Sequence, residues 1–440
     1  MRAVSRFCRA HIRPGDILAV VVLLLPLAFA YPRLGSLTDA GAAATLHDAG
    51  KLSGIIALAA MVLAALFSAR LPVVDRYFGG LPRIWHLHRA LGYGAFIMIM
   101  VHVLLLAFAQ LDTSLNATVA TLFPSLTAYA IWAGWAAWAL MAVFLLPTFG
   151  LYDNPSYQRW KRLHLLSAPA LLLALAHGVW LSPQTSLWWA LGTLAVAAIA
   201  WRKLLAPVVA RRDYEVVAVE PLATGVVEVS LKPMKGGLRY RPGQFIYLTP
   251  HDPDLPAGRG EEHPYTVASA PRDEVLRIGI KDLGDASGAL QNVTVGSRAQ
   301  VEGPYGTFLD RRFPSRDQLW LAGGIGITPF ISGARHLDAS PSSDPSNVHA
   351  FYLAEDKSRA YYLEEMQDIT ARVPEFAVTA HYFRDHGAIT AEFLQQHCPD
   401  FAEREVYICG PPPMVDHLLR LLRAAGVPRY RIRCEAFQFL

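Results

Sequence analysis

Six apolar stretches in the first half of the chain constrain its fold more than any other feature. They run over residues 16–31, 51–67, 90–109, 126–147, 165–181 and 187–206. Each is close to the about 20 residues that an α-helix needs to cross a bilayer. The sequence therefore predicts a six-helix α-helical transmembrane bundle. The first stretch could also be a signal peptide cleaved near Ala28-Phe29-Ala30, but a retained helix is favoured because the other helices follow directly.

Basic residues are concentrated on alternate connections between these stretches. They lie before the first stretch, between the second and third, between the fourth and fifth, and after the sixth, as Arg2, Arg6, Arg9, Arg13, Arg70, Arg76, Arg83, Arg89, Arg159, Lys161, Arg162, Arg202, Lys203, Arg211 and Arg212. The opposite connections hold only Arg33 and Lys51 near the second helix. The positive-inside rule then places both termini and the whole second half in the cytoplasm. The second half carries no basic stripe, which argues against nucleic-acid binding.

The third and fifth predicted helices each carry two histidines, His88 with His102 and His164 with His177. Ionisable side chains inside a membrane are costly and usually functional. Both helices start on the cytoplasmic side, so His88 and His164 are expected near the inner face and the other two near the outer face. Fourteen residues correspond to about 21 Å of helical rise, a separation that suits two stacked haems. The pattern predicts that each haem is held by one histidine from each helix.

Helical geometry treats the two histidine pairs differently. At about 100° per residue, His102 comes back within roughly 40° of His88. The thirteen steps from His164 leave His177 roughly 140° away in a straight helix. Pro169 lies between them and is expected to bend or re-wind the helix. His86 is an alternative to His88, but its place nearer the basic loop favours a position at the membrane interface.

The second half has the texture of a soluble protein. Short β-rich runs punctuated by Gly and Pro predict a small antiparallel barrel, with strands at Tyr214–Val219, Val226–Leu231, Gln244–Thr249 and Val275–Ile280. Apolar runs that alternate with helical stretches then predict a parallel sheet, with strands at Gln318–Ala322, His349–Leu353, Ala377–Tyr382 and Glu405–Cys409. We therefore predict three domains, at residues 1–207, 208–314 and 315–440.

Three motifs in this half carry chemistry. They are His263-Pro264-Tyr265-Thr266, Gly323-Gly324-Ile325-Gly326-Ile327-Thr328-Pro329 and Cys409-Gly410-Pro411-Pro412-Pro413-Met414. Glycines directly after a strand let backbone N–H groups approach a pyrophosphate, and the N-terminus of a following helix favours its negative charge. The second and third motifs both follow predicted parallel strands, where ligands of such sheets bind.

Together these motifs make the second half resemble the ferredoxin–NADP⁺ reductase superfamily. The resemblance implies an FAD-binding barrel and an NAD(P)-binding α/β domain. It implies FAD contacts from His263, Pro264, Tyr265, Thr266, Ile280, Lys281 and the turn Gly284–Leu290 with Ser287. It implies nicotinamide contacts from Gly323, Gly324, Gly326, Thr328, Cys409, Gly410, Pro411 and Glu435. A C-terminal aromatic residue is expected to stack on the flavin, and Phe437 is preferred over Phe439 because Glu435-Ala436-Phe437 matches the Glu-x-aromatic ending of the family.

The first half resembles the ferric-reductase-like transmembrane domain of NADPH oxidases and ferric reductases. The resemblance rests on the histidine spacings of fourteen and thirteen and on the His177-Gly178 pair. It implies two b-type haems with His88, His102, His164 and His177 as ligands, and a place in the bacterial inner membrane. One departure is the middle of the fifth helix, where family members often carry an aromatic residue and this chain has Ala168-Pro169-Ala170-Leu171.

The resemblance implies that electrons pass from NADPH or NADH to an acceptor outside the cell. Dioxygen, giving superoxide, is the favoured acceptor, and ferric iron, a quinone or a periplasmic partner are alternatives. Lys51 and His47 could supply positive charge near the outer haem, although an anchoring role at the interface is favoured. A channel with a redox sensor is disfavoured because no apolar stretch carries regularly spaced arginines.

The nicotinamide preference depends on the residues that follow the strand ending at Leu353. The chain continues as Ala354-Glu355-Asp356-Lys357-Ser358-Arg359. An acidic residue here favours the free ribose hydroxyl of NADH, whereas a basic residue accommodates the 2′-phosphate of NADPH. Since both kinds are present, the sequence predicts weak discrimination with useful rates for NADH.

Overall fold

The computed structural model describes residues 12–30, 41–149, 157–183, 185–310, 316–339 and 347–435. The chain divides into two compact units. One is helical and contains Ile12–Leu71 and Arg83–Pro207. The other contains Pro72–Pro82 and Val208–Leu440, and we call it the reductase unit.

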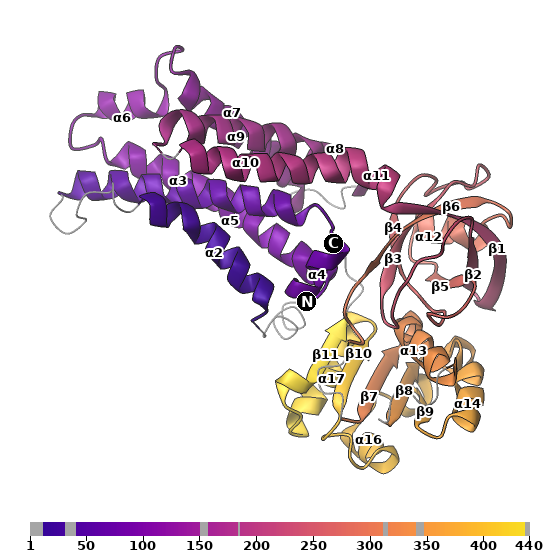
Figure 1. Ribbon diagram of the computed structural model, residues 1–440. Coiled ribbons are helices and arrows are strands. Elements are labelled where there is room, and N and C mark those ends of the chain that lie inside the picture. Colours follow the sequence, from indigo (N-terminus) through magenta and orange to yellow (C-terminus); the bar gives the residue numbers. More distant parts are fainter. Residues whose placement is uncertain are drawn as a thin grey trace. The chain divides into compact units, whose positions relative to one another are not determined.

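The helical unit contains five helical segments long and apolar enough to cross a membrane (Figure 1). They are Ala42–Phe67, Leu81–Phe108, Tyr129–Thr148, Arg159–Leu181 and Thr185–Val209. The predicted first span is α2 (Pro14–Ala30), a shorter apolar helix, so the predicted count of six is not confirmed. The helices of this unit are α2, α3 (Ala42–Phe67), α5 (Leu81–Phe108), α6 (Leu115–Leu122), α7 (Tyr129–Leu145), α8 (Tyr157–Leu163), α9 (Ser167–Leu181), α10 (Thr185–Ala200) and α11 (Ala206–Val209).

The segment Arg159–Leu181 is not a uniform α-helix. A 3₁₀ turn, His164–Leu166, separates α8 from α9. A 3₁₀ turn advances about 120° per residue instead of about 100°. Three such residues add about 60° and so remove part of the roughly 140° mismatch between His164 and His177. The re-winding expected near Pro169 is therefore present, and it lies just before the proline.

The first part of the reductase unit is an antiparallel sheet of six strands. The strands are β1 (Arg211–Ala223), β2 (Val226–Pro233), β3 (Phe245–Pro250), β4 (His263–Thr266), β5 (Leu276–Lys281) and β6 (Arg298–Tyr305), in the order β4-β3-β6-β1-β2-β5. The four predicted strands of this region correspond to β1, β2, β3 and β5. A bridge between Val267 and Ile278 links the end of β4 to β5, but closure into the predicted barrel is not confirmed.

The second part is a five-stranded parallel sheet with helices on both faces. The strands are β7 (Gln318–Gly323), β8 (Val348–Ala354), β9 (Phe376–Tyr382), β10 (Glu405–Cys409) and β11 (Ile432–Glu435), in the order β11-β10-β7-β8-β9. One face packs on α13 (Thr328–Ala339) and α14 (Leu363–Arg372). The other packs on α16 (Ala391–His397) and α17 (Pro412–Ala424). The central strands β7, β8 and β10 are almost fully buried because both faces of the sheet are covered.

Shorter helices complete the reductase unit. They are α4 (Pro72–Phe78), α12 (Asp285–Ala289) and α15 (Phe383–His386). The helix α4 comes from the connection between α3 and α5, yet it packs against β6. That connection therefore folds as part of the reductase unit.

Candidate functional site

The structure brings the four membrane histidines together as two pairs. The ring centroids of His88 and His164 are 6.0 Å apart, and those of His102 and His177 are 6.2 Å apart. A metal–imidazole bond is about 2 Å long, so two rings on opposite sides of one metal have centres about 6 Å apart. Each pair can therefore hold one metal ion between its rings. Among the described residues no group of three or more His, Cys, Asp or Glu side chains is placed to hold a metal ion.

Backbone carbonyl groups orient three of the four imidazole rings. His102 Nδ1 donates to the Gly50 carbonyl oxygen at 2.7 Å, and His177 Nδ1 donates to that of Ala130 at 2.8 Å. His88 Nδ1 donates to the Ala64 carbonyl oxygen at 2.9 Å. Such bonds fix the tautomer and leave the Nε2 lone pair for a metal. They are the carbonyl partners commonly found behind metal-binding histidines.

Two glycines make room for the outer pair. A methyl group on Gly54 of α3 would lie 2.7 Å from His102 Nδ1. A methyl group on Gly134 of α7 would lie 2.8 Å from His177 Nδ1. Both contacts are too close for a Cβ atom, so only glycine fits there. Sequence reasoning missed both residues, because a glycine in a membrane helix is common at any helix–helix contact.

The inner pair has aromatic neighbours. The His164 ring lies 5.1 Å from the Phe144 ring and 5.0 Å from the Trp160 ring, and Trp85 contacts His88 edge-on at 5.6 Å. His164 Nδ1 is buried and has no hydrogen-bond partner among the described residues. The inner pair is therefore fixed more by ring packing than the outer pair is.

An aromatic side chain of α7 lies between the two pairs. Gly134 of α7 contacts the outer pair, and Phe144 contacts the inner pair. Trp138 lies between them on the same helix, four residues after Gly134 and six before Phe144. Its ring stacks on Phe96 of α5 with centroids 6.5 Å apart and an interplanar angle of 11°, and its Nε1 donates to Met100 Sδ at 3.1 Å. The aromatic residue that α9 lacks thus has a counterpart supplied by α5 and α7.

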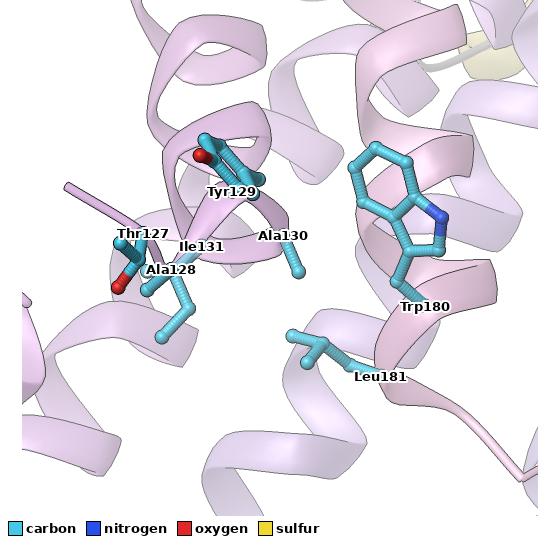
Figure 2. Close-up of a pocket in the computed structure, with 7 residues that line it drawn as sticks. All are labelled: Thr127, Ala128, Tyr129, Ala130, Ile131, Trp180 and Leu181. Carbon is cyan, nitrogen blue, oxygen red and sulfur yellow. The ribbon is translucent and has the colours of Figure 1, made fainter. Parts of the chain in front are cut away.

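A shallow pocket of about 540 Å³ lies beside the outer pair. Figure 2 shows Trp180 and Leu181 of α9 across the pocket from Tyr129, Ala130 and Ile131 of α7. The Ala130 carbonyl group is the one that accepts the hydrogen bond from His177. No charged side chain lines the pocket.

The basic residues expected near the outer end have an acidic neighbour. Asp48 lies 3.8 Å from Lys51 and 3.7 Å from His47. The carboxylate offsets the positive charge that Lys51 would present to an anionic product. This arrangement favours the anchoring role for these residues.

The flavin-binding strand predicted at His263–Thr266 is β4, an edge strand of the antiparallel sheet. Thr266 is 4% exposed, and its buried Oγ1 has no hydrogen-bond partner among the described residues. A buried hydroxyl without a partner is costly, which fits a bound group that supplies one. Burial raises the pKa of Tyr265, so its hydroxyl stays protonated. His263 lies 3.4 Å from Glu261, and Pro264 pairs with Tyr247 of β3.

The residues predicted to hold the flavin pyrophosphate lie on β5 and α12. Ile280 and Lys281 end β5, and Ser287 lies on α12. The Ser287 hydroxyl accepts from Leu283 N at 2.9 Å and donates to the Gly284 carbonyl oxygen at 3.1 Å. These bonds hold the Gly284–Leu290 turn in one conformation.

The two glycine motifs meet at the carboxyl edge of the parallel sheet. Strands β7 and β10 are neighbours, with Ala322 paired to Cys409. A side chain on Gly326 would collide with the Cys409 carbonyl group, and one on Gly410 would lie 3.1 Å from Gly323 Cα. Gly324 has a φ of +53°, a conformation that favours glycine. Backbone therefore lies directly against backbone where a dinucleotide is expected.

The other two residues predicted to hold the dinucleotide, Thr328 and Pro411, lie at the N-terminal ends of α13 and α17. Thr328 begins α13 and donates its hydroxyl to the Ile325 carbonyl oxygen at 3.0 Å. Pro411 lies at the N-terminal cap of α17. Both helices thus begin at the edge of the sheet where the glycines meet.

Cys409 and Glu435 are register partners on adjacent strands β10 and β11. Burial raises the pKa of Glu435 to about 8. Burial, together with the Glu435 carboxylate, raises the pKa of the Cys409 thiol well above its usual range. Both groups are therefore neutral at pH 7. The predicted C-terminal aromatic residues Phe437 and Phe439 lie outside the described residues.

A basic residue that sequence reasoning missed lies beside the predicted ribose contacts. Arg384 of α15 forms ion pairs with Glu355 and with Asp356 Oδ2, the latter at 2.7 Å. Arg359 donates to the Thr224 carbonyl oxygen at 3.3 Å. Thus the two acidic residues do not present an uncompensated negative charge. Arg384 follows β9, a strand away in the sequence, so local spacing gave no signal for it.

Three segments of the chain match known protein families. Residues 53–175 match the ferric reductase like transmembrane component, residues 211–308 match an FAD-binding domain, and residues 320–419 match the oxidoreductase NAD-binding domain. The three segments follow one another in the order expected from the sequence.

Curated relatives match the second half of the chain. The reductase component of propane 2-monooxygenase from Rhodococcus jostii is 29% identical over 238 residues, which are 50% of this chain and 62% of that protein. The ferredoxin reductase component of 3-ketosteroid-9-alpha-monooxygenase from Mycolicibacterium smegmatis is 33% identical over 46% of this chain and 57% of that protein. The chain thus spans about three fifths of these relatives.

Among solved structures, the ferredoxin reductase in carbazole 1,9a-dioxygenase matches 52% of this chain and 69% of that chain, with 28% identity and a TM-score of 0.43. Taken together, the family matches and the reductase relatives show that the chain joins a segment similar to the ferric reductase like transmembrane component to segments similar to FAD-binding and oxidoreductase NAD-binding domains, an arrangement consistent with a fusion of the ferric reductase and NADPH oxidase kind.

Proposed function

We propose that this protein transfers electrons from cytoplasmic NAD(P)H across the bacterial inner membrane to an external acceptor, with FAD and two b-type haems as carriers. The observation that carries the proposal is the pair of histidine pairs, with ring centroids 6.0 and 6.2 Å apart. An NAD(P)H-binding reductase and two metal sites in series would together make a transmembrane electron path.

Each haem would be held by one histidine of α5 and one of the α8–α9 segment. His88 and His164 would hold the inner haem, and His102 and His177 the outer haem. Their Nδ1 bonds to carbonyl groups support metal ligation through Nε2. A haem held by two histidines would supply electron transfer rather than binding of a substrate at the metal.

The reductase unit would supply the electrons. When bound, FAD converts the two-electron chemistry of NAD(P)H into single electrons. The Thr266 hydroxyl and Tyr265 would contact the flavin ring, with His263, Pro264, Ile280, Lys281 and Ser287 around the rest of the cofactor. Gly323, Gly324, Gly326, Thr328, Gly410 and Pro411 would hold the dinucleotide. Cys409 and Glu435, both neutral, would border the nicotinamide without adding charge.

We further propose that α2 also crosses the membrane, which brings the number of membrane helices to six, and that both termini are cytoplasmic. The partition of basic residues supports this orientation. The domain limits 1–207, 208–314 and 315–440 are part of the same proposal, and the family matches at 53–175, 211–308 and 320–419 lie inside them.

Dioxygen is the acceptor that the outer surface favours. The pocket beside His177 is lined by Tyr129, Ile131, Trp180 and other uncharged residues. A ferric chelate would have to give up much of its hydration to enter such a pocket, whereas dioxygen would not. One-electron reduction there gives superoxide.

The decisive experiment is NADH and NADPH oxidation by the purified, haem-loaded protein in detergent. Oxygen, a ferric chelate and a soluble quinone should be supplied in turn, with a superoxide-specific probe and superoxide dismutase. We expect oxygen uptake and a probe signal that superoxide dismutase removes. Turnover with the ferric chelate or the quinone alone would replace dioxygen with that acceptor.

A further inference from the structure

A buried cluster of charged residues joins the two halves of the reductase unit. Arg335 of α13 is 8% exposed, and its Nη1 lies 3.0 Å from Glu228 Oε2 of β2, which is 4% exposed. The same guanidinium forms a two-bond pair with Glu365 of α14, at 2.6 and 2.8 Å. Arg335 therefore connects the antiparallel sheet to the helices of the parallel sheet.

The contacts of Arg335 extend along one stripe of α13. Thr328, Ser332 and Arg335 are separated by four and three residues, so they lie on the same face of the helix. The Ser332 hydroxyl donates to the Ser269 carbonyl oxygen at 2.7 Å, and Arg335 Nη1 donates to that of Ala268 at 3.0 Å. Thr328, in turn, lies against Gly279 of β5. All three residues of this stripe therefore touch the antiparallel part of the unit.

The antiparallel and parallel parts of the reductase unit lie very close together at Gly279 of β5. A methyl group there would lie 2.8 Å from Thr328 Cγ2 and 2.9 Å from the Tyr362 hydroxyl oxygen. Tyr362 in turn has its ring 5.3 Å from the Arg335 guanidinium carbon and adopts a φ of +59°. The contact is thus tightly packed around the charged cluster.

The position of this stripe relates it to flavin reduction. α13 begins directly after the glycine turn Gly324–Ile327, where the dinucleotide is expected. Ala268 and Ser269 come two and three residues after Thr266, the last residue of the flavin strand β4. One helix therefore links the segment that would hold the nicotinamide to the segment that would hold the flavin.

We infer that Arg335 is a positioning residue that fixes the distance between the nicotinamide and the flavin by tying α13 to Glu228 and Ala268. The inference rests on the proposed cofactor sites. In the reaction a hydride, with its electron pair, leaves nicotinamide C4 and bonds to the flavin, so the rate depends on how closely the two rings are held. A misplacement of about 1 Å can slow such a step about a hundredfold.

The test is anaerobic stopped-flow reduction of the full-length, FAD-loaded protein by NADH. We expect Arg335→Met to lower the limiting rate constant about tenfold to a hundredfold, with little change in the NADH concentration that gives half the limiting rate. NADH deuterated at C4 should then show a full isotope effect on that rate. A merely structural defect would instead reduce the amplitude of flavin bleaching and leave the rate constant unchanged.

Two further variants separate positioning from general loss of an ion pair. Arg372→Met removes an exposed ion pair with Asp338 that also joins α13 to α14, at a distance of 2.7 Å. Among the described residues, this pair makes no hydrogen bond or ion pair with the antiparallel sheet. Glu365→Gln leaves Arg335 bonded to Glu228 and Ala268. In both variants NADH should reduce the flavin at a rate within about threefold of that in the unmodified protein, since each lost contact joins α13 to α14 and neither reaches the antiparallel sheet.

The outcomes are distinct for the two levels of the proposal. If the flavin of the unmodified protein accepts no electrons from NADH or NADPH, the proposed function fails and this inference fails with it. If the unmodified protein and Arg335→Met are reduced at the same rate with full amplitude, only the positioning role is overturned. The same holds if Arg372→Met is slowed as much as Arg335→Met.

Discussion

The Asp75 carboxylate accepts a hydrogen bond from the Gly306 backbone N–H at 3.0 Å, although 231 positions separate the two residues. Asp75 lies on α4 and is 2% exposed. Gly306 follows β6 and has a φ of +98°. The bond therefore fixes the connection between α3 and α5 to the end of an FAD-domain strand.

The first prediction concerns this bond. Asp75→Ala leaves the Gly306 N–H buried without an acceptor, so we expect the reductase unit to lose about 1–3 kcal/mol of stability. Asp75→Asn keeps an acceptor oxygen and should lose less. Denaturant unfolding followed by flavin fluorescence measures the difference. Equal effects of the two substitutions would show that the bond contributes nothing beyond the volume of the side chain.

The same residue predicts a pH dependence of stability. Burial raises the pKa of Asp75 from 3.8 to about 6, against the opposing effect of the Gly306 bond. The folded protein therefore binds more protons than the unfolded chain between about pH 4 and 6, and its stability falls as the pH rises through that window. Above pH 6 this contribution is constant. Asp75→Asn should remove the slope, and an unchanged slope would assign it to another group.

The second prediction concerns the outer haem. The unmodified protein should contain two low-spin b-type haems per chain. His102→Leu or His177→Leu should remove one and stop reduction of the external acceptor, while NADPH still reduces the flavin. Gly54→Ala should have a similar effect, because its methyl group would lie 2.7 Å from His102 Nδ1.

Haem content by pyridine haemochrome assay and redox titration check this prediction. The inner haem is the internal control, since none of the three substitutions touches His88 or His164. One haem per chain in the unmodified protein would contradict the pairing.

The third prediction concerns transfer between the haems. Trp138 stacks on Phe96 and lies between the positions of α7 that contact the two pairs. Trp138→Leu should slow reduction of the outer haem while both haems stay bound and flavin reduction is unchanged. Trp189→Leu is the control, because Trp189 lies on a different helix, α10, with 65% of its surface exposed. Equal slowing by both would show that the effect is one of packing.

The fourth prediction concerns the choice between NADH and NADPH. Arg384 pairs with Glu355 and Asp356, so neither sign of charge dominates and the protein should discriminate only weakly between NADH and NADPH, with NADH used at a useful rate. Arg384→Gln exposes both carboxylates to the 2′-phosphate and should lower kcat/KM for NADPH relative to NADH about tenfold, or about 1.4 kcal/mol. A preference of the unmodified protein for NADPH above about a hundredfold, or roughly 2.7 kcal/mol, would show that Lys357 and Arg359 dominate.

Much of the fold follows from local patterns. Long apolar runs predicted the five segments that are long and apolar enough to cross a membrane, and β-rich runs predicted β2, β3 and β5 close to their observed limits and the middle of β1. The glycine turn was placed correctly after β7 because a strand, a turn and a helix are each encoded by neighbouring residues. The first apolar stretch and the closure of the barrel were less certain from sequence, since helix length and edge pairing depend on neighbours in space.

The histidine pairs show where sequence geometry reached its limit. Spacing predicted which histidines share a depth, but a straight helix could not bring His164 and His177 into register. The 3₁₀ turn His164–Leu166 contributes to the correction.

The sequence by itself determined the elements, their order and the residue types at the proposed cofactor sites, because hydropathy, turn chemistry and motif spacing act over a few residues. Only the tertiary structure decided the long-range contacts. Arg335 meets Glu228 across 107 positions, and Arg384 meets Glu355 across 29. Such partners are set by the way whole sheets and helices pack, and a single sequence carries no local signal for which distant charges will meet.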